Sequence, residues 1–163
     1  MSSSSKNKTV ASDKAAGAKV KPAARRKART FALQALYQHQ IAAMPMNEVE
    51  AQFRVNFDMR KADVPYFQDL VQGVAKQQAE IDQQLAKHSD IKVADLDAVE
   101  LNTLRIGTYE LVSRIDVPYQ VVINEAIELA KRFGGDESYK FVNGVLERIA
   151  LEVRSVEMQE KAK

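Results

Sequence analysis

The fold of this chain is decided by the stretch from Val117 to Leu146, VPYQVVINEAIELAKRFGGDESYKFVNGVL. Its first half places apolar side chains three and four residues apart, the spacing of one helix face; these are Val122, Ile123, Ala126, Ile127, Ala130 and Phe133. Gly134-Gly135 then predicts a helix end in left-handed backbone, which residues with a β-carbon adopt at a cost. Residues 136–138 offer a new N-cap. A second apolar stripe follows: Val142, Val145, Leu146, Ile149, Val153 and Val156. The pattern predicts a helical hairpin.

Similar spacing upstream predicts further helices. The first begins near Pro22, which suits a first helical turn, and runs to about Ala42, before Met44-Pro45-Met46 breaks it. Asn47 with Glu50 resembles a capping box for a short helix. The tetrapeptide DVPY occurs at residues 63–66 and again at 116–119. In each copy we expect Asp to cap a helix and Pro to lie in its first turn.

The helix before the hairpin is expected to be central. Asp95 is its predicted cap, and one face carries Leu101, Leu104, Thr108, Leu111 and Ile115. Val99 and Ile106 lie on another face, so the helix should be buried on two sides. No segment combines two-residue alternation with turn signals, so we predict no strand. The fold class is therefore all-α, a compact bundle of six to seven helices.

Composition limits what the chain can do. Its 163 residues suffice for one domain with a core, and the absence of cysteine excludes disulfides and thiolate chemistry. With only His39 and His88, which we expect at the surface or its boundary, a histidine metal site is not expected. No apolar run is long enough to span a membrane, and we find no phosphate-binding loop. We expect a cytoplasmic protein without catalytic residues, metal or cofactor, and not an enzyme.

Charge is distributed unevenly along the chain. Residues 1–29 hold nine basic side chains and one acid, a net +8, so the remainder must carry −6 to reach the overall +2. We predict that residues 1–20 form a disordered, basic, Ser-rich tail, that 21–156 form the helical domain, and that 157–163 are a charged C-terminal tail. A basic arm on an acidic body is typical of a chain whose end meets a polyanion. Association of the arm with the acidic body is the alternative.

The candidate phosphate-binding cluster lies at the start of the first helix: Lys21, Arg25, Arg26, Lys27 and Arg29. Arg25 and Arg29 are four residues apart and share a helix face. A guanidinium group can pair with two phosphate oxygens at once. The cations also oppose the positive end of the helix dipole, which favours a functional reason for them. The alternative is a solvated charged helix end.

Several segments together resemble the NusB family of transcription antitermination factors. They are INEAIELAK followed by S-x-KFVNGVL, KPAARRKAR at residues 21–29, ALY at 35–37 and LRIGTYEL at 104–111. The resemblance covers roughly Lys21 to Val153. It implies two packed three-helix bundles with a break near Ser89 to Ala94, hence sub-bundles of about 21–88 and 95–156. It also implies binding of single-stranded boxA RNA together with the ribosomal protein NusE, within an RNA polymerase antitermination complex.

The resemblance adds site residues that spacing does not identify. It implies that Tyr37, Lys140 and Phe141 join the arginines as an RNA surface, with Glu137 modulating affinity from the adjoining loop. Aromatic rings can stack unpaired bases, although core packing is the alternative for both rings. The family is arginine-rich where this chain has Lys27, which keeps the charge but loses the forked geometry.

Other interpretations remain. One is a stand-alone NusB-like RNA-binding module related to ribosomal RNA methyltransferases, and another is a helical homodimeric scaffold without an RNA role. A homodimer could also hide the basic surface. Within the hairpin, Asn124 and Glu125 are expected to bridge helices by hydrogen bonds, and Asn143-Gly144 to mark a close helix–helix contact.

Overall fold

The computed structural model describes residues 20–162, so nearly all of the expected N-terminal tail lies outside the described residues. Within that range the chain is all-α, as predicted, without a strand. The described residues form eight α-helices, one more than the upper expectation of seven. They are α2 (Pro22–Ala42), α3 (Met46–Asn56), α4 (Val64–Lys76), α5 (Gln78–His88), α6 (Ala98–Ser113), α7 (Tyr119–Phe133), α8 (Ser138–Val153) and α9 (Ser155–Ala162). A short 3-10 helix, η1 (Val93–Asp95), lies between α5 and α6. The expected C-terminal tail is thus helical through residue 162.

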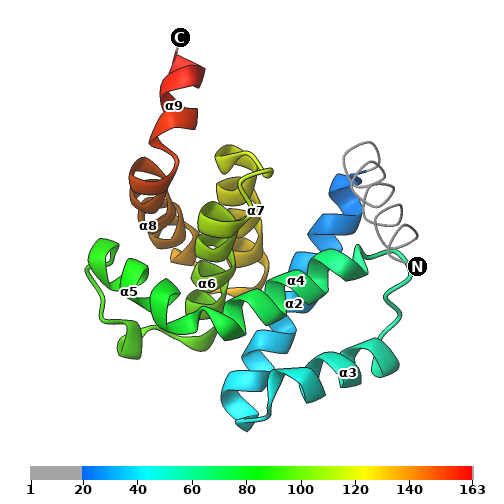
Figure 1. The fold of residues 1–163 in the computed structure, drawn as a ribbon. Coiled ribbons are helices and arrows are strands. Elements are labelled where there is room, and N and C mark those ends of the chain that lie inside the picture. Colours follow the sequence, from blue (N-terminus) through cyan, green and yellow to red (C-terminus); the bar gives the residue numbers. More distant parts are fainter. Residues whose placement is uncertain (1–19, 163) are drawn as a thin grey trace, which may run out of the picture.

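Helix α6 lies at the centre of the molecule, as predicted. All residues from Leu101 to Leu111 are buried, and α6 packs against α2, α4, α5, α7 and α8 (Figure 1). Ile115, expected on this helix, lies beyond its end and is exposed. A helix covered all round must bury its few polar groups with partners. This central position is why the buried polar contacts described below converge on α6.

The helices divide in space at a different point from the expected one. Helices α2, α3 and α4 pack together, while α5 packs mainly against α6 and α8 (Figure 1). The expected break at residues 89–94 would group α5 with the first three helices. Instead, α4 and α5 are separate helices that meet at Gln77, and the chain passes there into the second group.

The predicted helix caps are confirmed in some places and wrong in others. Asp63 caps α4, since its carboxylate accepts a hydrogen bond from the Tyr66 amide at 3.1 Å. In the second DVPY copy, Pro118 takes the cap position and Asp116 instead accepts hydrogen bonds from Arg114. Asp97, not Asp95, caps α6. Helix α3 begins at Met46 after Pro45 and has no side-chain cap, so the capping box at Asn47 is wrong.

The hairpin α7–α8 forms as predicted, but its turn is not left-handed. Gly134 has φ −94° and ψ −179°, and no glycine among the described residues has a positive φ. Gly134 is needed for space, because a Cβ would lie 2.8 Å from the Ala130 carbonyl oxygen. Glu137 precedes α8 without a side-chain cap, and α8 ends at Val153, so Val156 lies on α9 and is exposed.

The close helix contact expected at Gly144 is wrong. A Cβ there would meet only the end of the flexible Arg148 side chain, at 3.3 Å. Gly73 and Gly107 instead hold the close contacts: a Cβ would lie 2.2 Å from the Tyr109 ring at Gly73, and 2.7 Å from Leu146 at Gly107. These glycines let α4 and α8 approach α6.

Candidate nucleic-acid interface

The first turns of α2 carry cations without any acidic residue of their own. Lys21 is the N-cap residue, Pro22 starts the helix, and Arg25, Arg26, Lys27 and Arg29 follow. Cations at a helix start oppose the helix dipole, so their charge must be balanced from elsewhere. In this fold the balancing acids come from other elements, and they separate the cluster into buried and exposed members.

Arg29 is buried, with only 4% of its side chain exposed. Its Nε and Nη2 donate to the carboxylate of Glu110 on α6 at 2.8–3.1 Å, and Nη1 reaches Glu125 on α7 at 3.5 Å. Burial by itself would lower the pKa of Arg29, but the Glu110 carboxylate outweighs it and the pKa is raised. The expectation that Arg29 offers its guanidinium to RNA is therefore corrected, because the face it shares with Arg25 turns toward the centre.

Tyr66 completes the buried cluster around Glu110. Its hydroxyl donates to the Glu110 carboxylate, and the guanidinium carbons of Arg25, Arg29 and Arg114 lie 4.2, 5.3 and 4.7 Å from its ring centre. Burial, and then the Glu110 charge, raise the pKa of the tyrosine. Glu110 is 1% exposed, so this cluster fixes α2 and α4 on α6.

Arg25 lies at the edge of the buried cluster. Its side chain is 11% exposed, with Nε 3.5 Å from Asp63 and Nη1 4.0 Å from Asp116. Arg25 therefore links the start of α2 to both DVPY segments. Arg25 also lines a cavity of about 860 Å³, from which it could contact a ligand. The apolar residues that line this cavity include Val20, Pro22, Val117, Pro118 and Val121.

Arg26, Lys27 and Lys21 are the exposed cations of the cluster. The Arg26 side chain is 55% exposed, and its Nε donates to both oxygens of Glu125 at 3.0 and 3.3 Å. The hydrogen bond and charge of Glu125 raise the pKa of Arg26. Glu125 thus bridges α7 to α2, as predicted, whereas Asn124 is exposed and lines the larger cavity.

The second group of expected site residues comprises Tyr37, in the second half of α2, and Glu137, Lys140 and Phe141, at the start of α8. Tyr37 is 42% exposed, and Phe141 is half-buried against the core. Glu137 and Lys140 are both exposed and form an ion pair at 2.8 Å. The start of α6 ties these elements together, because Asn102 donates to Gln40 of α2 and Ser138 of α8 donates to Glu100, both at 2.8 Å.

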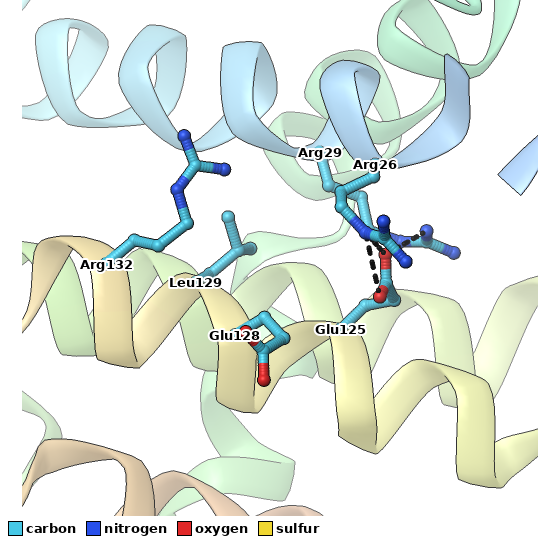
Figure 2. Close-up of a pocket in the computed structure, with 6 residues that line it drawn as sticks. All are labelled: Arg26, Arg29, Glu125, Glu128, Leu129 and Arg132. Atoms are coloured by element: carbon cyan, nitrogen blue, oxygen red, sulfur yellow. Dashed lines mark hydrogen bonds and ion pairs between the residues drawn. The ribbon is translucent and has the colours of Figure 1, made fainter. Parts of the chain in front are cut away.

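Sequence reasoning missed one exposed cation between the two groups. Arg132, in the last turn of α7, donates from Nη1 to the Thr30 hydroxyl of α2 at 3.2 Å. Figure 2 shows Arg132 reaching from α7 toward α2 at one end of a cavity, with Arg26 and Glu125 at the other. Basic residues are common in the last turn of a helix, because they interact favourably with the helix dipole. The sequence therefore did not mark Arg132 as a candidate binding residue.

The described residues contain no group of three or more His, Cys, Asp or Glu arranged to hold a metal ion. None of their helices is both long and apolar enough to cross a membrane. The arrangement offers exposed cations at the start of α2 and partly exposed aromatic side chains on α2 and α8, which suits a flexible polyanion.

Comparison with known proteins identifies the family. The model of the NusB family matches residues 26–151. The chain is 52% identical over 142 residues to the transcription antitermination protein NusB of Pseudomonas syringae pv. tomato, covering 87% of this chain and 86% of that protein. It is 51% identical over 140 residues to the protein of the same name from Alcanivorax borkumensis, covering 86% and 93%.

Solved structures agree with the sequence matches. T. maritima NusB superposes with a TM-score of 0.69 at 34% identity, over 78% of this chain and 91% of that one. A chain from a crystal structure of the antitermination factors NusB and NusE in complex with dsRNA gives 0.68 at 30% identity, over 77% and 94%. The fold, the sequence matches and the family model agree, and the chain belongs to the NusB family.

Proposed function

We propose that this protein is a transcription antitermination factor that binds single-stranded boxA RNA together with NusE and promotes processive transcription of ribosomal RNA operons. The observation that carries the proposal is the set of exposed cations Lys21, Arg26 and Lys27 at the start of α2, together with the exposed ring of Tyr37 and the half-buried ring of Phe141. Support comes from relatives named transcription antitermination protein NusB and from the related NusB–NusE–RNA complex.

We assign different roles in RNA binding to the cations and to the aromatic rings of this surface. Arg26, Lys27 and Lys21 would supply phosphate affinity that does not depend on sequence, while Tyr37 and Phe141 would stack bases. Lys140 would contact phosphate once its ion pair with Glu137 opens, so Glu137 would weaken binding. Arg29 would act indirectly, by fixing α2 on α6. The role is binding rather than catalysis, and we place it in the cytoplasm.

RNA titration tests the proposal. A boxA-like single-stranded RNA and a scrambled control are titrated at several salt concentrations with wild type and with Arg26→Ala/Lys27→Ala. We expect wild type to prefer boxA, and the double variant to bind both RNAs more weakly with a salt slope flatter by about two. Lys92→Ala, which removes an exposed cation outside the proposed surface, is the matched control.

A second titration adds NusE. We expect NusE to raise boxA affinity of wild type, because the heterodimer offers a larger RNA surface. Equal binding of both RNAs, no effect of NusE and no effect of the double variant would together remove the proposal and favour a helical scaffold. Sedimentation over a range of protein concentrations would then determine whether that scaffold is a homodimer.

A further inference from the structure

Arg132 is an exposed cation that lies across a cavity from the basic start of α2. The cavity has a volume of about 370 Å³ and is lined by Arg26, Arg29, Glu125, Glu128, Leu129 and Arg132 (Figure 2). Its apolar floor is Leu129, which is buried, and its two ends are the side chains of Arg26 and Arg132. The site therefore spans α2 and α7, and is not confined to the basic segment of α2.

Arg26 and Arg132 each use one guanidinium nitrogen for a hydrogen bond within the protein, and their other nitrogens can still donate to a ligand. Arg26 is bonded to Glu125 through Nε, and within residues 20–162 neither of its terminal nitrogens has a hydrogen-bond partner. Arg132 is bonded to Thr30 through Nη1 and lies over the Phe133 ring at 4.9 Å. Its Nε and Nη2 have no partner in the same range. Each guanidinium is thus oriented by the protein and can still donate to a phosphate oxygen.

Thr30 of α2 connects the two arginines. Thr30 is one helical turn from Arg26, whose carbonyl accepts the Thr30 hydroxyl at 3.1 Å. Arg132 contacts that same hydroxyl, while the guanidinium of Arg26 extends from α2 to Glu125 on α7. Two cations at opposite ends of one cavity suit an extended sugar-phosphate backbone better than a single small anion.

The acids of the cavity have unequal roles. Glu125 is largely buried and is already neutralised by Arg26 and Arg29. Glu128 is exposed, and among the described residues it forms no ion pair. Its charge is close enough to contribute to the raised pKa of Arg26. An unpaired carboxylate at the rim of a phosphate site opposes binding.

We propose that this cavity seats a stretch of RNA backbone, with Arg26 and Arg132 each holding a phosphodiester group and Glu128 limiting the affinity. The inference rests on the proposed RNA-binding function and extends its surface from α2 onto the C-terminal turn of α7. Arg132 is accordingly a binding residue.

The test is the same RNA titration with single substitutions. We expect Arg132→Ala to lower boxA affinity about three- to tenfold at moderate salt and to flatten the salt slope by about one. Arg132→Lys should recover the slope but only part of the affinity, because it loses the forked donors. Glu128→Gln should raise affinity. Thermal unfolding of each variant should match wild type, since both side chains are exposed.

Lys131→Ala is the matched control. It removes the same charge one residue away, from a side chain that lies over the Tyr139 ring at 4.9 Å and does not line the cavity. If Lys131→Ala and Arg132→Ala lower RNA affinity equally, the two cations act only through long-range electrostatic attraction, and the proposed phosphate site at Arg132 is wrong. Normal binding by Arg132→Ala, while Arg26→Ala/Lys27→Ala is weakened, would overturn this inference and leave the proposed function intact. Absence of boxA preference in wild type would instead overturn the proposed function.

Competition distinguishes an RNA backbone from a free anion. We expect inorganic phosphate at millimolar concentration to displace RNA from wild type no more than an equal ionic strength of chloride does. Displacement specific to phosphate, and absent in Arg132→Ala, would assign the cavity to a small anion and overturn the RNA assignment.

Discussion

Arg26 and Arg29 are three residues apart on one helix, yet their environments differ completely. Arg29 is 4% exposed and hydrogen-bonded to a carboxylate that is itself 1% exposed, whereas Arg26 is 55% exposed. A buried charge without its partner is strongly destabilising, while an exposed ion pair contributes little. The same residue type is therefore part of the buried structure at one position and exposed to solvent at the other.

At this scale we expect Arg29→Ala to lower the free energy of unfolding by about 3–5 kcal/mol, because it leaves the Glu110 carboxylate buried without its cation. Arg26→Ala should cost less than about 1 kcal/mol and act mainly on RNA binding. Urea unfolding of the two variants beside wild type measures the difference. A loss below about 1 kcal/mol for Arg29→Ala would contradict the assigned structural role.

Two glycines lie at close helix–helix contacts, Gly73 on α4 and Gly107 on α6. On α4, Gly73 faces Tyr109 of α6, whose hydroxyl donates to Asp69 at 2.8 Å. The ring fills the space where a Cβ would stand. On α8, Gly144 has no comparable neighbour, so the two mid-helix glycines differ in what an added methyl group would meet.

We therefore expect opposite effects from the same substitution at the two positions. Gly73→Ala should destabilise the protein by about 1–3 kcal/mol, because the Tyr109 ring must shift and weaken its bond to Asp69. Gly144→Ala should stabilise it by up to about 1 kcal/mol, since alanine favours a helix and only a flexible arginine must move. The Tm of each variant, measured by thermal unfolding beside wild type, tests both expectations. Equal changes in Tm would contradict the packing described for Gly73 and Gly144.

Ion pairs connect the two helix groups across the whole molecule. Asp116, in the α6–α7 connection, accepts two hydrogen bonds from Arg114 at 3.0 Å and lies 4.0 Å from Arg25 of α2. Hydrogen bonding from Arg114 lowers the pKa of Asp116 below its ordinary value of 3.8, although partial burial opposes the shift. Arg154, which is buried, donates to the carbonyls of Glu110, Leu111, Arg114 and Val117 and so fixes the same connection.

The lowered pKa of Asp116 makes part of the stability dependent on pH. A depressed folded-state pKa contributes stability that is complete above the unfolded value near 4 and is lost as pH falls toward the folded value. We expect Asp116→Asn to lower the Tm at pH 7, and the difference from wild type to shrink between pH 4 and pH 2. A Tm difference that stays constant over that range would show that Asp116 acts through packing and not through its charge.

The sequence by itself determined the all-α class, the full extent of α2, the α7–α8 hairpin and the central position of α6. These features follow from apolar periodicity and from Pro and Gly positions, which act within a few residues of one another. Asp63 was predictable as a cap for the same reason. The basic cluster from Lys21 to Arg29 was predicted from charge and helix spacing, whereas Tyr37, Glu137, Lys140 and Phe141 came from the family resemblance, which local pattern could not replace.

Only the tertiary structure decided which cations of α2 remain exposed and able to contact a ligand. The acids that neutralise Arg26 and Arg29 stand 81 to 99 residues away in sequence, and Arg132 meets Thr30 across 102 residues. The two DVPY copies also diverge: Asp116 accepts hydrogen bonds from Arg114, two residues before it, while Asp63 caps its own helix, and both carboxylates lie within 4.0 Å of Arg25. Periodicity fixes which face of a helix a residue occupies, but the charge that meets that face depends on how distant segments pack.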